Sequence, residues 1–336
     1  MTRTAKFART ALALVLPVIT ATALLPASSA AQGALTSVSL RLDYLPAGYH
    51  APLFLALQRG YYREQGIDLQ ISDGKGSNPS LQSVAAGNDL IVLANYTSMI
   101  EGTTRGMPVI GVGGLLQRLP DSVISLQGSG IKTPKDLEGR TMSISPASAV
   151  FKMFSAFVAA TGIDISKIRQ VQADSNAVLT LLLQGQVSFA TGWAFTDALK
   201  VAAQKPIEPP MVMSDYGVNV LGAGFIVQKA TAAGKGDTIR AFLAATAKGY
   251  ADGEKDPEAA VAAMIAARPS GSSELWLKQL KLFPPFMTTE RSKGHPFGWT
   301  AREDWAQTVD ILSKYFGMTA SVDLASLYTN DFLPAK

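Results

Sequence analysis

Four side chains that can hold a small molecule stand close together in the chain: Asp43, Tyr44, Tyr49 and His50. A carboxylate accepts hydrogen bonds, an imidazole can donate or accept one, and tyrosine rings stack on flat ligands. His50 is one of only two histidines in the sequence. The group predicts a small-molecule site in which Asp43, together with Asp174 later in the chain, accepts hydrogen bonds from amino groups of the ligand. A hydrolytic triad is disfavoured, because the chain has no G-x-S-x-G nucleophile turn.

The elements around these residues are well marked. A strand-like stretch leads into the polar turn, and Pro52 suits the first turn of the helix that follows. Gly66 is typical of a helix C-terminus, and the alternating apolar residues after it predict a second strand. A β-α-β unit places such a turn at the end of the sheet, beside open helix N–H groups. The same pattern is equally consistent with a well-capped unit that binds nothing.

Similar junctions recur along the chain, where predicted strands end in short polar turns that open helices. Ser, Asn and Asp are preferred at such positions because their oxygens cap the first helical turn, so capping alone explains each junction. Taken together, the junctions line the carboxyl edges of the predicted sheets, where ligands bind in α/β proteins. Trp193 also follows the end of a predicted strand. The candidate ligand contacts are Asp43, Tyr44, Tyr49, His50, Ser77, Asn95, Tyr96, Ser98, Ser145, Ser148, Asp174 and Trp193.

The whole chain alternates strand-like and helix-like patterns, which predicts an α/β fold. The predicted strands are Val38–Asp43, Ile67–Ser72, Leu90–Ala94, Val109–Val112, Val123–Leu126, Thr141–Ser145, Ile168–Gln172, Val187–Thr191, Met211–Ser214 and Gly224–Gln228. The predicted helices are Pro52–Gln65, Pro79–Ala86, Thr97–Arg105, Ala147–Thr161, Asn176–Gln184, Thr238–Ala251, Pro257–Ala267, Ser273–Lys281, Ala301–Phe316 and Asp323–Asn330.

The strand signal stops after Thr231, so the last third of the chain is expected to be helical and to brace the first lobe. The chain is then expected to cross between two lobes near Leu116–Ser122 and near Val220–Gly224. Residues 37–116 and 225–336 are assigned to lobe 1, and residues 117–224 to lobe 2. The Gly222-Ala223-Gly224 run suits a hinge, and small residues in a packed strand explain it equally well.

The first thirty residues are predicted to be a cleavable signal peptide. Basic residues precede an apolar run from Ala11 to Leu25, and small residues lead up to Ala30 as the expected cleavage site. The run is short and interrupted by proline, which disfavours a membrane anchor. No cysteine follows it, which excludes a lipoprotein. We therefore expect a soluble, monomeric protein in the periplasm.

Composition excludes several functions. The chain has no cysteine and two histidines, so disulfides, thiolate metal sites and histidine-based metal sites are not expected. The full sequence has 30 basic and 26 acidic residues, and three of the basic ones, with no acidic one, lie in the predicted signal peptide. The remaining 27 to 26 balance gives no electrostatic footprint for nucleic acid. Phosphate-loop, H-E-x-x-H and dinucleotide fingerprints are missing, so no cofactor is predicted.

Several stretches resemble the NMT1/THI5-like family of periplasmic solute-binding proteins. The match begins with LDYLPAGYHAPLFLALQRGYYREQGIDLQI and continues with AAGNDLIVLANYTSMIEGTTRGMPVIGVGGLL, GSGIKTPKDLEGRTMSIS and LYTNDFLP. The resemblance implies a two-lobed periplasmic-binding-protein fold of the type II-like class with a hinge between the lobes. It also implies a non-enzymatic solute-binding component of an ABC importer that serves a permease in the inner membrane.

One branch of this family is a synthase of the thiamine pyrimidine, which uses its own histidine and a lysine-bound pyridoxal phosphate. These residues fall on Ser98 and Ala94 here, and the iron-binding cysteines fall on the cysteine-free stretch 221–225. The resemblance therefore implies a binder and not a synthase. His50 matches the histidine of the family, whereas Tyr44 stands where many members have tryptophan.

Four interpretations of function remain open from the sequence. The first is import of a pyrimidine-type thiamine precursor. The second is binding of an aliphatic sulfonate, taurine, nitrate or a small aromatic acid. A secreted enzyme that uses Asp43 and His50 on a heterocycle, and a sensor that presents its ligand to a receptor kinase, are less favoured.

Overall fold

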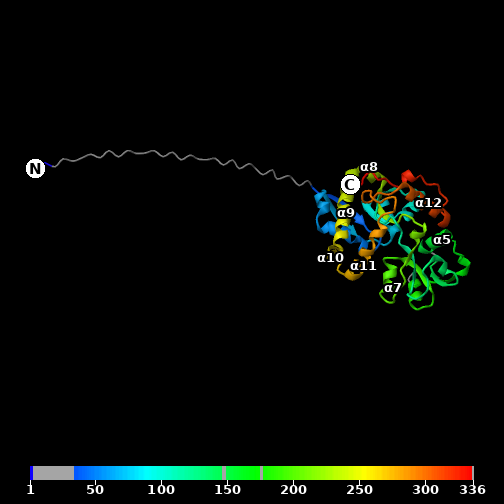
Figure 1. Ribbon diagram of the computed structural model, residues 1–336. Coiled ribbons are helices and arrows are strands. Elements are labelled where there is room, and N and C mark those ends of the chain that lie inside the picture. Colours follow the sequence, from blue (N-terminus) through cyan, green and yellow to red (C-terminus); the bar gives the residue numbers. More distant parts are fainter. Residues whose placement is uncertain (3–33, 146–148, 175–176, 335–336) are drawn as a thin grey trace. The chain divides into compact units, whose positions relative to one another are not determined.

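Two five-stranded sheets organise the chain from Ala34 onward, in a computed structural model that describes residues 1–2, 34–145, 149–174 and 177–334 (Figure 1). The predicted signal peptide and its cleavage site lie outside these residues, as do Ser148 and the first residues of two predicted helices. Residues 34–336 form one compact unit. We call the part built on the first sheet lobe 1 and the part built on the second sheet lobe 2.

The sheet of lobe 1 has the order β2-β1-β3-β10-β4. Strand β1 pairs in parallel with β2 and β3, while β10 runs antiparallel between β3 and β4. Its central strands are buried on both faces, which explains their continuous apolar runs. The bounds are Thr36–Arg41 for β1, Ile67–Ser72 for β2, Ile91–Asn95 for β3, Val109–Gly114 for β4 and Ala223–Gln228 for β10.

The sheet of lobe 2 repeats this plan with the order β7-β6-β8-β5-β9. Strand β6 pairs in parallel with β7 and β8, and β5 runs antiparallel between β8 and β9. In each sheet, therefore, one reversed strand brings its amino end to the edge where the parallel strands end. The bounds are Asp121–Ser125 for β5, Thr141–Ile144 for β6, Arg169–Gln172 for β7, Phe189–Trp193 for β8 and Met211–Val212 for β9.

The α/β architecture predicted from the sequence is confirmed. Each of the ten predicted strands overlaps a strand of the structure, although β9 ends early because the chain turns into a 3-10 helix, η4, over Met213–Tyr216. Figure 1 shows α5 and α7 in the green stretch of lobe 2 and α9 to α12 in the yellow to orange-red stretch. The helices are α1 Ala51–Gln58, α2 Tyr61–Glu64, α3 Ser77–Ala85, α4 Tyr96–Thr104, α5 Ala149–Thr161, α6 Val178–Leu183, α7 Asp197–Ala202, α8 Lys229–Gly234, α9 Gly236–Lys255, α10 Pro257–Ala267, α11 Ser273–Leu282 and α12 Arg302–Tyr315.

Two helix predictions are wrong in part or in whole. The helix predicted over Pro52–Gln65 divides into α1 and α2, because Gly60 takes a positive φ of 76° between them. The helix predicted over Asp323–Asn330 reduces to a 3-10 turn over Leu324–Ser326. The chain after that turn pairs with the edge of β4 instead: the N–H of Gly111 bonds to the carbonyl of Leu327 at 2.9 Å.

The connections between the sheets run side by side. The N–H of Leu116 donates to the carbonyl of Ala223, and the N–H of Gly222 donates to the carbonyl of Leu116, both at 2.8 Å. A Cβ at Gly222 would lie 2.3 Å from the Leu116 side chain, so close approach of the two segments requires glycine there. Gly224 lies inside β10, where a Cβ would lie 1.9 Å from the Tyr96 hydroxyl.

None of the helices that the structure describes is long and apolar enough to cross a membrane.

Candidate functional site

A cleft of about 340 Å³ lies between the carboxyl edges of the two sheets. This volume is in the range of about 300–1,000 Å³ that small-molecule sites occupy. Both lobes contribute to its walls, as expected for a ligand site in facing α/β sheets. The lining residues are Asp43, Tyr44, Leu45, Ala47, Tyr49, Gly76, Ser77 and Asn95 from lobe 1, and Val150, Trp193, Thr196, Asp197 and Lys200 from lobe 2.

Asp43 is the charged centre of the lobe 1 wall. Its carboxylate accepts a hydrogen bond from the Tyr49 hydroxyl at 2.8 Å and lies 2.9 Å from Nε2 of His50. Nδ1 of His50 accepts the N–H of Ala47 at 3.0 Å, so the ring proton is on Nε2 and points at Asp43. His50 is fully buried behind Asp43, with both ring nitrogens bonded inside the protein. In this arrangement it positions the carboxylate.

The same carboxylate shapes the properties of Tyr49. Burial, with the nearby charge of Asp43, raises the pKa of Tyr49 well above its usual value. The hydroxyl therefore stays protonated and remains a donor to Asp43. Its ring stacks on Phe283 with centroids 5.6 Å apart. These contacts fix the lobe 1 wall before any ligand arrives.

Asn95 is the polar residue of this wall with spare hydrogen-bonding capacity. It occupies the N-cap of α4 in an extended conformation, yet its side chain makes no capping bond to that helix. Its Oδ1 is buried and has no partner among the residues that the structure describes. The backbone N–H of Asn95 donates instead to the Ser77 hydroxyl at 3.0 Å. Capping, which would explain an asparagine here, does not account for its side chain.

The lobe 2 wall is built on the end of β8 and the start of α7. Trp193 is the last residue of β8, and its backbone N–H donates to the Asp197 carboxylate at 3.0 Å. Asp197 also pairs with Lys200 one helical turn later, at 2.9 Å. The wall therefore offers a half-buried indole face beside one carboxylate and one ammonium group.

Phe195 joins the two lobes through contacts between aromatic rings. It follows β8 in lobe 2 and is fully buried. Its ring lies 5.8 Å from Tyr49, 5.8 Å from Phe283 and 5.3 Å from Phe286, all of lobe 1. Aromatic pairs at such distances contribute both buried area and favourable ring geometry. A cluster of aromatic rings therefore extends from lobe 2 into lobe 1, and Tyr49 links it to the cleft.

The structure places the predicted site residues in three groups. Asp43, Tyr44, Tyr49, Ser77, Asn95 and Trp193 line the cleft, and His50 lies directly behind it. Tyr96 points into the core, where its hydroxyl donates to the carbonyl of Gly113 at 2.8 Å and burial raises its pKa. Half-buried Ser98 and Ser145 and exposed Asp174 are not among the residues that line the cleft, and Ser148 lies outside the described residues.

Asp197 and Lys200 were missed by sequence reasoning. Both belong to α7, a six-residue helix too short to produce a periodic apolar pattern. A usable signal was present, because Thr196 and Asp197 follow a predicted strand and are residues of the helix-capping type. Of the described residues that line the cleft, Lys200 alone is basic, and it is already paired with Asp197.

The cleft presents hydrogen-bond acceptors and aromatic side chains. Within the described part of the chain, no cluster of three or more His, Asp or Glu side chains could hold a metal ion. Asp43, Asp197 and Oδ1 of Asn95 present acceptors, while the side chains of Tyr44, Tyr49 and Trp193 present ring faces. Such a lining complements a flat molecule that donates several hydrogen bonds.

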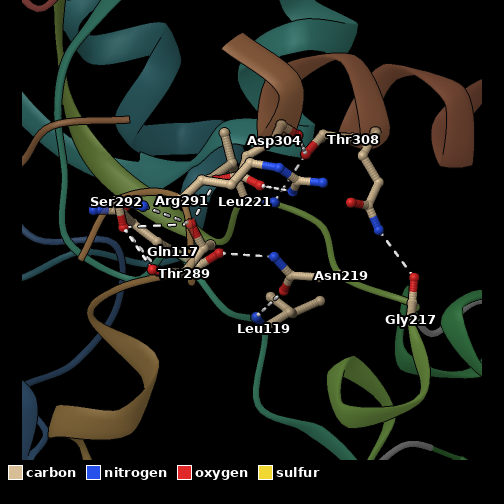
Figure 2. A network of polar contacts seen from close by, with 11 residues as sticks. Gln117, Leu119, Gly217, Asn219, Leu221, Thr289, Arg291, Ser292, Asp304 and Thr308 are labelled. Atoms are coloured by element: carbon tan, nitrogen blue, oxygen red, sulfur yellow. Dashed lines mark hydrogen bonds and ion pairs between the residues drawn. The ribbon is translucent and has the colours of Figure 1, made fainter. Parts of the chain in front are cut away.

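A polar network joins the segments that connect the lobes (Figure 2). Asn219 accepts the N–H of Leu119 and donates to the carbonyl of Gln117, both at 3.1 Å, so one side chain ties the two connections together. Close by, Asp304 of α12 is buried and pairs with Arg291 at 2.6 Å. Asn219 thus braces the segments that connect the two lobes.

The fold is that of a two-lobed periplasmic binding protein. Its architecture matches the crystal structure of the periplasmic aliphatic sulphonate binding protein SsuA from Escherichia coli. The TM-score is 0.71 at 16% sequence identity, over 89% of this chain and 94% of that one. At this identity the likeness concerns the fold alone.

The chain belongs to the NMT1/THI5 like family, whose model matches residues 47–260. A riboflavin-binding protein, RibY, from Chloroflexus aurantiacus is 25% identical, over 90% of this chain and 88% of its own length. A formylaminopyrimidine-binding protein from Halalkalibacterium halodurans is 21% identical, over 84% and 86%. The relatives also include an enzyme, a 4-amino-5-hydroxymethyl-2-methylpyrimidine phosphate synthase from Legionella pneumophila, at 24% identity over 88% of this chain and 92% of its own.

Proposed function

We propose that this protein is the solute-binding component of an ABC importer and holds a flat, hydrogen-bond-donating heterocycle in its cleft. A pyrimidine-type thiamine precursor is the first candidate. The observation that carries the proposal is Asn95: a buried amide oxygen, unpartnered among the described residues, lines a cleft between two lobes. Leaving a buried polar atom unbonded costs about 1–3 kcal/mol, which a ligand donor would recover.

The charge of the cleft favours amino groups over anions. Asp43 is a nearly buried acceptor, and Asp197 adds a second carboxylate on the opposite wall. An aminopyrimidine offers N–H donors to these groups and a ring for Trp193. A sulfonate or nitrate would need free cations or donors, whereas Lys200 is engaged by Asp197. Sulfonates, taurine, nitrate and small aromatic acids are therefore second candidates.

The mechanism we infer is lobe closure. A ligand that touches both Asn95 and Trp193 binds the closed form better than the open form, and so shifts the population towards closure. The connecting segments braced by Asn219 would supply the hinge, and a permease in the inner membrane would recognise the closed form. The protein would act in the periplasm as a monomer after removal of its signal peptide.

We propose binding without catalysis. Ala94, which stands at the lysine position of the synthase branch, is fully buried in β3 and cannot form a Schiff base. Ser98 stands at the histidine position and cannot supply ring atoms. A solute bound by the protein should therefore be recovered unchanged after denaturation, without pyridoxal phosphate absorbance.

The test begins with mass spectrometry of what copurifies with the protein, followed by calorimetry with formylaminopyrimidine, riboflavin and taurine. Asn95→Ala should weaken binding of the preferred compound about tenfold or more, because one buried hydrogen bond is lost. Asn88→Ala, at an exposed position of lobe 1, is the matched control and should bind normally. Tight binding of taurine alone, or a ligand returned chemically altered, would contradict the proposal.

A further inference from the structure

Asp121 is a buried carboxyl group with spare hydrogen-bonding capacity, outside the set of residues that line the cleft. It is the first residue of β5 and only 2% exposed. Its Oδ1 has no hydrogen-bond partner in the described part of the protein. Buried carboxyl groups are normally paired, because removing charge from water is costly. The position therefore requires an explanation beyond packing.

The sheet register brings Asp121 to the cleft. Strand β5 is antiparallel to β8, and Asp121 is paired directly with Trp193. Residues directly opposite in antiparallel strands project to the same face of the sheet. The connection is tightened by a hydrogen bond from the N–H of Ala194 to the carbonyl of Pro120 at 2.9 Å. Asp121 thus shares a sheet face with the indole that forms the lobe 2 wall.

None of the described basic side chains forms an ion pair with Asp121. Helix α7 contributes Asp197, whose charge acts on Asp121, and Lys200, which pairs with Asp197. The connecting segment contributes Arg118, which is engaged by Asp215 of η4. Element η4 also carries Tyr216, and strands β8 and β9 carry no titratable side chain in their sequences FATGW and MV.

These surroundings keep the Asp121 carboxyl group protonated up to about neutral pH. Burial raises the pKa of Asp121, a hydrogen bond with the Trp193 side chain lowers it in part, and the charge of Asp197 raises it, so that together they bring it to about 7. The group therefore changes charge within the range in which a periplasmic protein works. When it is charged, a carboxylate with no cation partner among the described residues lies beside Asp197, with the Trp193 side chain as its hydrogen-bond donor.

We propose that Asp121 is a positioning residue that sets the Trp193 face of the cleft through its protonation state, so that solute affinity responds to pH. The proposal rests on the proposed function. A ligand stacked on Trp193 removes water from the cleft and thereby favours the uncharged carboxyl. Binding of an uncharged ligand should take up a proton and be tighter below neutrality than above it.

The first experiment uses the ligand-free protein. We expect tryptophan emission to change between about pH 5 and pH 9 with a midpoint near the pKa of Asp121, about 7. Trp276, Trp299 and Trp305 also emit, so the signal of Trp193 is taken as the difference between each protein and its Trp193→Phe counterpart. Asp121→Asn should abolish the transition in this difference. Asp174→Asn, at an exposed position of lobe 2, is the matched control and should retain the transition. No transition in the natural chain, or one that persists in Asp121→Asn, would overturn the proposal.

The second experiment measures riboflavin, a flat ring that is uncharged near neutral pH, by quenching of its fluorescence at about pH 6 and about pH 8. We expect severalfold tighter binding at the lower pH, up to about tenfold for each unit by which binding raises the pKa of Asp121. The Asp121→Asn variant should bind riboflavin equally tightly at both pH values. The same pH ratio in both proteins would overturn the proposal. Failure of riboflavin to bind at all would count against the ligand class, and the emission transition would still decide the role of Asp121.

Discussion

The two walls of the cleft satisfy their polar groups in different ways. In lobe 1, Asp43 receives hydrogen bonds from both Tyr49 and His50, so its charge is supported within the wall. In lobe 2, Asp121 keeps one oxygen without a partner among the described residues. Both carboxyl groups are nearly buried. The carboxyl group of lobe 1 is therefore held in place before a ligand binds, whereas we propose that the one in lobe 2 changes its charge with pH and with ligand.

The difference follows from local sequence. Asp43, Tyr49 and His50 lie close together in the sequence. The turn that opens the first helix therefore brings the Tyr49 and His50 donors to the Asp43 carboxylate. Asp121 has its neighbours in β8 and α7, more than seventy positions later, and these bring it an indole and a second acid. Donors from residues close in sequence are held in place by the local backbone. Donors from another strand depend on how the two segments pack.

The largest expected effect concerns stability and pH at Asp121. The folded chain keeps this proton up to about pH 7, while an unfolded chain loses it near its ordinary value of about 4. Between these pH values the folded state binds more protons than the unfolded state. The free energy of unfolding therefore falls as the pH rises from about 4 to about 7 and stays constant above that. The loss amounts to at most about 4 kcal/mol.

Urea unfolding at several pH values checks this prediction. The natural chain should lose stability between about pH 4 and pH 7 relative to Asp121→Asn, which should be the more stable protein at about pH 8. Asp174→Asn, at an exposed position of lobe 2, serves as the control and should follow the natural chain. Parallel stability curves for the natural chain and Asp121→Asn would show that Asp121 does not hold a proton, and would remove the contrast between the walls.

The next effect tests the lobe 1 wall. Asp43→Ala leaves the Tyr49 hydroxyl and the Nε2–H of His50 buried without their acceptor. Each unsatisfied donor costs about 1–3 kcal/mol, so we expect a loss of about 3 kcal/mol in the free energy of unfolding. Asp237→Ala, at an exposed position of α9, should change it by less than about 0.5 kcal/mol. A loss as small as that of the control would mean that the wall is not organised by Asp43.

Much of the architecture could be predicted because each strand is marked by a pattern in its own short stretch of sequence. Runs such as 67–72 alternate or concentrate apolar residues between turn signals, and each produced a strand of the sheet. The cleft residues at strand ends followed from the rule that ligands bind at the carboxyl edge. Asn95 and Trp193 were found in this way.

The failed predictions share one physical cause: they depend on contacts between distant segments, which local sequence patterns do not show. Asp121 begins a strand, and the rule for strand ends overlooked it because β5 runs antiparallel in its sheet. Tyr96 follows a strand but turns into the core, where Gly111 and Gly224 leave space for its ring. The segment 323–330 has helix-like spacing of apolar residues, yet its backbone pairs with the edge of β4.

The smallest effect compares ring contacts on the two walls. Trp193 is half-buried in lobe 2, whereas the side chain of Tyr44 in lobe 1 is mostly exposed, with 58% of its surface accessible. We expect Trp193→Ala to weaken riboflavin binding roughly tenfold, a loss of about 1.4 kcal/mol, and Tyr44→Ala to weaken it less. Calorimetry on both variants, with Trp193→Phe as the control that keeps a ring, measures the difference. Because Trp193 reports the state of Asp121, Trp193→Ala should also reduce the pH dependence of binding, while Tyr44→Ala should preserve it. Equal losses from both alanine variants with an unchanged pH dependence would mean that the two walls act alike.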